Sequence, residues 1–335
     1  MRKLFILLLK FFVPILAVLI TYAWLDPFKV IWHYDSFYDA NNTISVPLDK
    51  DYVSTANYDN HYRNEHYDSF IFGNSRSIFY ETGKWSRYIS IGSKPYHFDA
   101  SSETLYGISK KIEYISGKGE KINNALLIVD DVLLSGGKPL DGHLFAVSPQ
   151  LEGYATLPDF HLQFLRTFLS YKFLPGYIEH TITGQVKPYM KKAALTEEAF
   201  LYNKQTNEMR HTTAESEIAS GTFYTAEKMK VFYKRKTSQH YSKAVIGKSQ
   251  QQMLREIAQI FKKQGTKYKI VINPLYDQVK LNKEDLAYLQ RLYGNENVHD
   301  FSGINIITKD YTNYYESAHY RPHVATAIMA EIYNK

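Results

Sequence analysis

Residues 125–129 read Ala-Leu-Leu-Ile-Val, and Asp130 and Asp131 follow them directly. A short, continuous apolar run that ends in polar residues is typical of a strand buried on both faces of a sheet. Similar runs predict strands both upstream and downstream, at 69–72, 96–98, 267–273 and 297–301. The first of these is closed by Gly73 and Asn74, which is a turn signal.

Segments with helical spacing separate these strands. They predict amphipathic helices at 103–115, 250–263, from 282 onward and from Pro322 onward. This alternation predicts one α/β domain over residues 67–335, with a mainly parallel, doubly wound sheet that binds ligands at the carboxyl ends of its strands. Residues 135–240 interrupt the alternation with helical pieces at 161–173, 196–204 and 225–234 and without a strong strand pattern, which predicts a helical insertion.

The first 25 residues predict a membrane anchor. Residues 4–25 are almost continuously apolar, and a helix of ~22 residues at ~1.5 Å each spans the ~30 Å hydrocarbon core of a bilayer. Arg2 and Lys3 make its start positive, so this end should stay cytoplasmic and the domain should lie outside the cytoplasm, held by a single-pass helix in the cell membrane. A signal peptide cleaved near Ala23 is the alternative. Residues 26–66 are expected to form a tether and lead-in.

Composition narrows the chemistry that the domain can perform. The 335 residues include no cysteine, which excludes disulfides, thiolate metal sites and a cysteine nucleophile. The net charge of +6 is scattered and fits attraction to lipid headgroups or an acidic glycan, so no nucleic-acid partner is expected. The histidines lack metal-ligand spacing and no glycine-rich phosphate loop is present, so neither a metal nor a nucleotide cofactor is expected. Asp130 and Asp131 fit a cation site with a third oxygen ligand or, alternatively, a helix cap beside a solvated residue.

Two segments carry the candidate chemistry. Ser75 follows the first strand and is expected at the start of a helix, where unpaired N–H groups favour an activated nucleophile; a plain helix N-cap is the other interpretation. Glu316 lies three residues before His319, just ahead of the last helix. A carboxylate in that position can reach the ring, fix its tautomer and stabilise the imidazolium, whereas two exposed residues without a shared role are the alternative.

The stretch Ser69-Phe-Ile-Phe-Gly-Asn-Ser75-Arg-Ser77, together with Glu316-x-x-His319, resembles the SGNH (GDSL-like) hydrolase superfamily. Within it, the chain is most similar to the membrane-anchored members that serve cell-envelope acylation, such as teichoic-acid D-alanylation and alginate O-acetylation. The resemblance covers 67–135 and 240–335 in architecture.

The resemblance implies a flavodoxin-like three-layer α/β/α domain and a Ser-His-acid triad that hydrolyses esters or transfers acyl groups. By matching position, Ser75 is the nucleophile, His319 the general base and Glu316 the orienting acid. The backbone N–H of Ser75 or Arg76 contributes to the oxyanion hole.

Asn74, Arg76 and Ser101 are the expected oxyanion or substrate-binding residues. Arg76 either binds an anionic substrate group or pairs with a nearby carboxylate. Ser101 lies where the family often has a glycine donor after its second strand. The chain also departs from the family by having Glu in place of Asp before the histidine, and Asp130 where an asparagine donor is usual.

Two hypotheses follow. The first is a membrane-anchored serine esterase or O-acyltransferase that acts on an envelope glycan or glycolipid, with a membrane acyl-transfer protein as partner. The second is a weakly active or inactive subunit of the same fold that binds glycan or assists assembly in an envelope acylation or export system. The altered oxyanion positions motivate the second, as do the 29 tyrosines, whose rings can stack on sugars.

Overall fold

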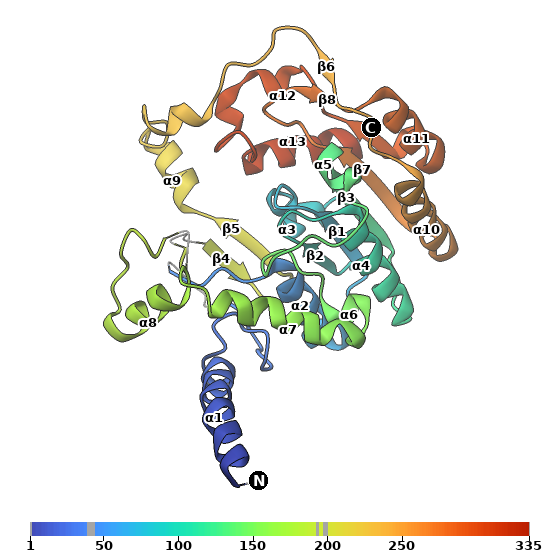
Figure 1. Ribbon diagram of the computed structural model, residues 1–335. Helices are drawn as coiled ribbons and strands as arrows, with labels where there is room; N and C mark the ends of the chain where they lie inside the picture. Colours follow the sequence, from blue (N-terminus) through green and yellow to red (C-terminus); the bar gives the residue numbers. More distant parts are fainter. Residues whose placement is uncertain (1, 39–43, 192–193, 197–199, 335) are drawn as a thin grey trace.

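The computed structural model describes residues 2–38, 44–191, 194–196 and 200–334 (Figure 1). Five parallel strands form the central sheet, in the order β2 (Pro95–Asp99), β1 (Ser69–Gly73), β3 (Asn124–Val129), β7 (Lys267–Ile272) and β9 (Val298–Asp300). The predicted mixed α/β fold with a mainly parallel sheet is therefore confirmed. Because the chain steps outward in opposite directions from β1 and β3, the carboxyl ends of these two neighbouring strands flank a topological switch point.

Helices cover both faces of this sheet, which gives three layers. The longer helices of the domain are α2 (Lys50–Glu65), α4 (Leu105–Gly117), α7 (Leu157–Phe168), α8 (Leu174–Thr183), α10 (Lys248–Gln264), α11 (Lys283–Tyr293) and α13 (Pro322–Tyr333). The shorter ones are α3 (Thr82–Trp85), α5 (Asp131–Ser135), α6 (Pro149–Glu152), α9 (Thr213–Ala219) and α12 (Ile306–Lys309).

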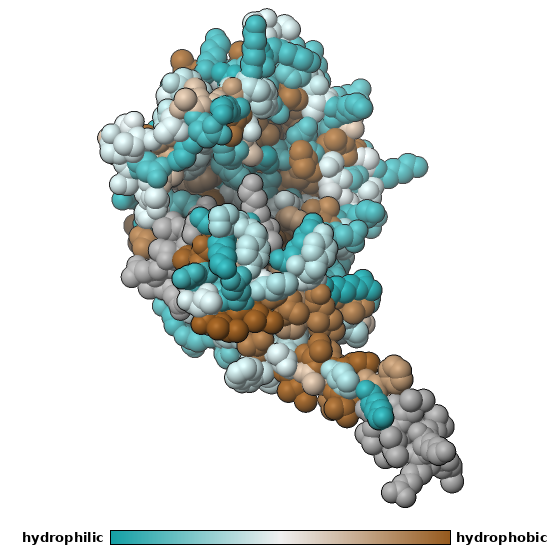
Figure 2. All heavy atoms as spheres, turned by 60° about the vertical axis from the view of Figure 1, so that its left-hand side comes forward, coloured by the Kyte–Doolittle hydropathy of each residue, from teal (hydrophilic) through white to brown (hydrophobic). Residues whose placement is uncertain are grey.

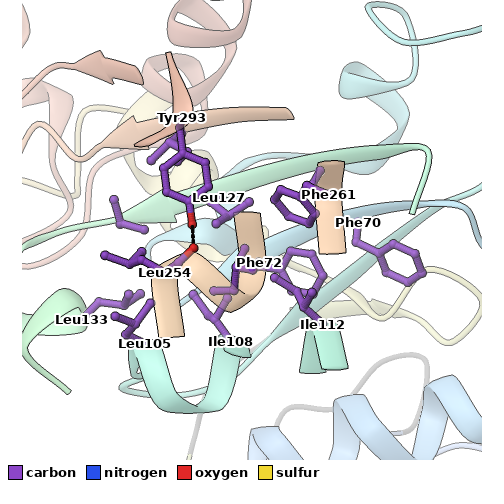
Figure 3. Packing of buried hydrophobic residues seen from close by; sticks show 14 of the residues in the cluster. Phe70, Phe72, Leu105, Ile108, Ile112, Leu127, Leu133, Leu254, Phe261 and Tyr293 are labelled. Carbon is purple, nitrogen blue, oxygen red and sulfur yellow. Dashed lines mark hydrogen bonds between the residues drawn. The ribbon is translucent and has the colours of Figure 1, made fainter. Parts of the chain in front are cut away.

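Alternation along the buried strands divides the core into two clusters. Phe70 and Phe72 of β1 point to one face, where they pack with α2, α4, α10 and α11. Figure 3 shows this cluster, in which the Tyr293 hydroxyl donates to the Leu254 carbonyl at 2.7 Å. Ile71 points to the opposite face and packs against α3 and α13. The two-sided burial explains why the strands are apolar without interruption.

The segment before the sheet differs from the expected tether. It contains α2, half of whose residues are buried, and Tyr58 of this helix is fully buried against the sheet. The sequence shows no apolar helical period here because α2 buries polar residues such as Ser54, whose hydroxyl donates to the Asp99 carbonyl at 2.8 Å.

The insertion at 135–240 contains strands as well as helices, whereas a helical insertion was expected. Residues 200–204, inside the piece 196–204 expected to be helical, belong to a hairpin of β4 (Phe200–Asn203) and β5 (Glu208–His211), and 197–199 lie outside the described residues. The helix expected at 225–234 is only a 3₁₀ turn at Lys228–Val231, and the one at 161–173 is α7. The remaining short strands are β6 (His240–Tyr241) and β8 (Val279–Lys280), which pair with each other.

The hairpin is tied to the free edge of the sheet. The His97 N–H donates to the Thr206 carbonyl at 2.9 Å, and the Asn207 amide donates to the His97 carbonyl at 2.7 Å. These bonds satisfy edge groups of β2, which would otherwise be exposed for pairing with another chain. They also hold the hairpin against β2, and β5 contacts residues 77–79, which follow β1.

The first helix, α1 (Arg2–Leu25), projects from the domain (Figure 1). Its end is anchored by Asp26, a buried carboxylate that accepts the N–H groups of Val30 and Ile31 at 3.0 Å. Tyr22 packs on Phe168 of α7 with ring centroids 5.1 Å apart. Among the residues that the structure describes, no helix is both long enough and apolar enough to span a bilayer. The membrane anchor therefore stays a prediction from sequence.

Candidate functional site

Ser75 lies on a tight turn at the carboxyl end of β1. The Ser77 N–H closes this turn onto the Asn74 carbonyl at 2.8 Å, and a 3₁₀ turn at Ser77–Phe79 follows. Only glycine fits at position 73, because a Cβ there would lie 2.8 Å from the Ile128 carbonyl oxygen. The helix expected after Ser75 is only this 3₁₀ turn, so the hydroxyl is held by turn geometry and receives no strong helix dipole.

His319 reaches Ser75 from the opposite end of the sequence. It lies in the loop before α13, where the Tyr315 N–H donates to the His319 carbonyl at 3.0 Å. Its Nε2 is 2.8 Å from the Ser75 hydroxyl, although 244 residues separate them along the chain. The structure therefore brings together the hydroxyl and imidazole that a serine nucleophile requires.

Glu316 completes the row of three side chains. One carboxylate oxygen bonds to His319 Nδ1, and the other accepts the Ala318 N–H at 2.7 Å. Burial raises the pKa of Glu316, but the hydrogen bonds from His319 and Ala318 outweigh it and hold that pKa below its usual value. Because an ionised carboxylate only accepts, the ring proton resides on Nδ1 and Nε2 is left to accept the Ser75 proton. The longer Glu thus reaches the ring by folding back onto its own loop.

Arg76 is directed away from Ser75. Its Nη1 donates to the buried carboxylate of Asp130 at 2.8 Å, and its Nε donates to the Ala318 carbonyl at 2.9 Å. The side chain is 18% exposed and that of Asp130 2% exposed. Of the two roles expected for Arg76, the geometry favours pairing with a carboxylate. The guanidinium bridges the turn that carries Ser75 and the loop that carries His319.

Asn74 belongs to the same buried network. The side-chain NH₂ of Asn74 donates to Asp130 at 2.9 Å, and its side-chain oxygen Oδ1 accepts the Arg76 backbone N–H at 3.1 Å. The Arg76 N–H, expected as an oxyanion donor, is therefore already engaged. Asp130 accepts three side-chain donors and caps α5 through the Leu133 N–H at 3.0 Å, so its charge is balanced by Arg76 and not directed at the Ser75 hydroxyl.

Of the two backbone N–H groups expected as oxyanion donors, the turn leaves that of Ser75 available, since it has no acceptor among the described residues. Ser101, the other expected donor, lies after β2 on the wall of the same cavity as Ser75. It is followed by Ser102 in the left-handed region at φ 51°, which turns the backbone sharply at this point. The described residues include no group of three or more His, Asp or Glu placed to hold a metal ion.

A cavity of about 610 Å³ opens beside the three side chains. The turn after β1, the loop after β2 and the His319 loop form one side, and the hairpin, α9 and residues 45–48 form the other. Its volume is that of a small-molecule site. His319 and Glu316 are each about one-third exposed, so solvent and substrate can reach them.

The chain matches no family model, no curated protein and no solved structure. The function must accordingly be argued from the geometry.

Two contributors to the site, Lys50 and Glu215, were missed in the sequence. Lys50 and Asp99 lie on the cavity wall, both nearly buried, with the Lys50 ammonium 3.7 Å from the carboxylate. Burial lowers the pKa of Lys50, and nearby Asp99 partly offsets this. Glu215 of α9 forms two hydrogen bonds with Arg321, at 2.8 and 2.9 Å, and fastens the insertion to the His319 loop. No local motif marks these residues, because their partners are distant in sequence.

Proposed function

We propose that this chain is a serine esterase or O-acyltransferase of the SGNH type. The observation that carries the proposal is the 2.8 Å contact between Ser75 Oγ and His319 Nε2, with Glu316 bonded to the other ring nitrogen. The strand order 2-1-3-7-9 also supports it, because it corresponds to the flavodoxin-like order 2-1-3-4-5 that the resemblance implies.

The proposed reaction has two acyl transfers. Ser75 Oγ attacks the carbonyl carbon of an acyl donor while His319 takes the hydroxyl proton and passes it to the leaving oxygen or sulfur. The charge on the carbonyl oxygen is met by the Ser75 N–H, and Glu316 stabilises the imidazolium. An acceptor hydroxyl or water then gives its proton to His319 and attacks the acyl-serine, which restores Ser75.

The proposed acceptor is a cell-envelope glycan or glycolipid, with a membrane acyl-transfer protein as partner and α1 as anchor in the cell membrane. Exposed apolar residues on α1, such as Phe11 and Ile15, support the anchor. The hydrophobic surface of α1 continues onto the adjoining part of the domain (Figure 2). The helix α7, on whose Phe168 the α1 residue Tyr22 packs, has Leu162 on its surface and Leu169 at its end. These two leucines are 40% and 48% exposed, which suits contact with a bilayer surface.

Fluorophosphonate labelling of the full chain tests the catalytic proposal. A nucleophilic Ser75 should be labelled in the wild type and unlabelled in Ser75→Ala. Ser77→Ala is the matched control, because Ser77 is on the same turn but its hydroxyl is buried and bonded to the Asn74 carbonyl at 2.8 Å. Equal labelling of wild type and Ser75→Ala would refute the role of Ser75.

One observation favours the second function, a weakly active or inactive glycan-binding or assembly subunit. Asn74 and the Arg76 N–H, both expected near the oxyanion, are bonded to each other. Losing one oxyanion donor costs about 10²–10³ in rate. If the chain acts as a binding subunit, Ser75→Ala and His319→Ala should leave envelope acylation in cells intact, and loss in both variants would contradict it.

A further inference from the structure

The wall of the cavity beside Ser75 is mostly apolar and aromatic. Phe79 lies next to the His319 ring, with centroids 6.2 Å apart, and Phe200, Met209 and Phe223 come from the insertion on the other side. Phe200 and Phe223 are buried in spite of lining the cavity. These side chains can make apolar contacts with a bound ligand but form few hydrogen bonds with it.

The charged side chains that the structure describes on this wall already have partners. Lys50 faces Asp99 at 3.7 Å, and Lys228 bonds to Glu217 at 2.7 Å and lies over the Phe223 ring. Glu316 is bonded to His319. An acyl group that carried an ammonium would need a carboxylate, and the two carboxylates that the structure describes on this wall, those of Asp99 and Glu316, are paired with a cation and with the His319 imidazole. The described part of the wall therefore offers no unpaired carboxylate to an acyl group that carries an ammonium.

The cavity is much larger than the smallest acyl groups. An acetyl group has one carbon beyond its carbonyl and would leave most of the roughly 610 Å³ unfilled. A hydrocarbon chain would remove apolar wall from water, and each buried methylene raises affinity about four-fold.

We infer that the acyl group carried by Ser75 is a hydrocarbon chain longer than acetyl, delivered as an ester or thioester. The inference rests on the proposed function, because it assigns the cavity to the acyl half of that reaction. The Ser75 Oγ–C bond forms, the bond from the carbonyl carbon to oxygen or sulfur breaks, and His319 moves the hydroxyl proton to the leaving group. The hydrocarbon part of the acyl group occupies the space between Phe79 and the insertion.

A series of p-nitrophenyl esters from acetate to hexanoate tests this with the full-length protein. The readouts are the rate of p-nitrophenolate release and the mass of the acylated Ser75 peptide. The four added methylenes should raise kcat/KM for acylation on the order of 10²-fold. Ala214→Phe, which fills the cavity from α9, should flatten this dependence on chain length, whereas Ala219→Phe, on the exposed side of the same helix, should preserve it.

The outcomes separate the two proposals. Acylation that depends on Ser75 but is flat or falls with chain length overturns the hydrocarbon assignment and leaves the serine chemistry standing. Turnover identical in wild type and Ser75→Ala overturns the serine chemistry and the assignment with it. The wild-type series is decisive even if Ala214→Phe does not fold.

Discussion

Replacing Arg76 with methionine distinguishes a bracing residue from a substrate ligand. Methionine keeps much of the length of the side chain and removes both donors, which leaves the Asp130 carboxylate buried without its cation. Breaking a buried ion pair costs about 3–5 kcal/mol, and the partial exposure of Arg76 places the loss near the lower end, at about 3 kcal/mol. With a urea m-value of about 3 kcal/mol/M, the midpoint of unfolding should fall by about 1 M.

The same substitution should change catalysis through kcat. Arg76 holds the Ala318 carbonyl, next to His319, so its loss lets the imidazole move relative to the Ser75 hydroxyl. A misplacement of about 1 Å costs on the order of 10²-fold in rate. Steady-state kinetics on the ester series should therefore show a lower kcat with little change in KM.

A second substitution provides the control. Asp130→Asn in the Arg76→Met background removes the stranded charge and should recover about 1–2 kcal/mol of the free energy of unfolding, measured as a double-mutant cycle. An unchanged urea midpoint in Arg76→Met, together with a raised KM and an unchanged kcat, would refute the bracing role and restore Arg76 as a ligand for an anionic substrate.

Three other outcomes are expected. Glu316→Gln should lower kcat by about 10²–10⁴ while circular dichroism shows a folded protein, because an amide no longer fixes the Nδ1–H tautomer; an unchanged kcat would contradict the orienting role. The hydrogen bond from Arg321 holds the pKa of Glu215 below its usual value, so its stabilising effect is present above the unfolded pKa and is lost as pH falls through the folded pKa. The free energy of unfolding, measured by denaturation at pH 7 and pH 4, should therefore fall less in Glu215→Gln than in the wild type. An equal fall in both proteins would rule out a stabilising role of the Glu215–Arg321 pair. Gly73→Ala should cost about 1–3 kcal/mol in thermal unfolding through overpacking, whereas Gly83→Ala, where a Cβ meets nothing within 4 Å, should not destabilise the protein.

Local patterns were sufficient for the central sheet and its covering helices. Strands buried on both faces read as unbroken apolar runs, and amphipathic helices repeat every three to four residues, so β3 at Asn124–Val129 and α10 at Lys248–Gln264 lie where the sequence predicts them. The same reasoning failed for α2, since its buried face includes Ser54 and Asn57, whose partners are Asp99 and Lys204. A polar residue signals burial only when its partner is known.

Three features could be predicted from local patterns: the parallel sheet, the positions of Ser75 and His319 at its carboxyl side, and Glu316 as the acid beside the histidine. Each depends on periodicity or on a short spacing along the chain. Contacts between distant parts of the chain bring the Ser75 hydroxyl to 2.8 Å from the imidazole and let Arg76 brace Asp130 and Ala318. They also make the β4–β5 hairpin part of the apolar wall beside Ser75 and His319. These contacts join residues 54 to 244 positions apart. Their energy depends on distance in space and burial, which no local stretch of sequence contains.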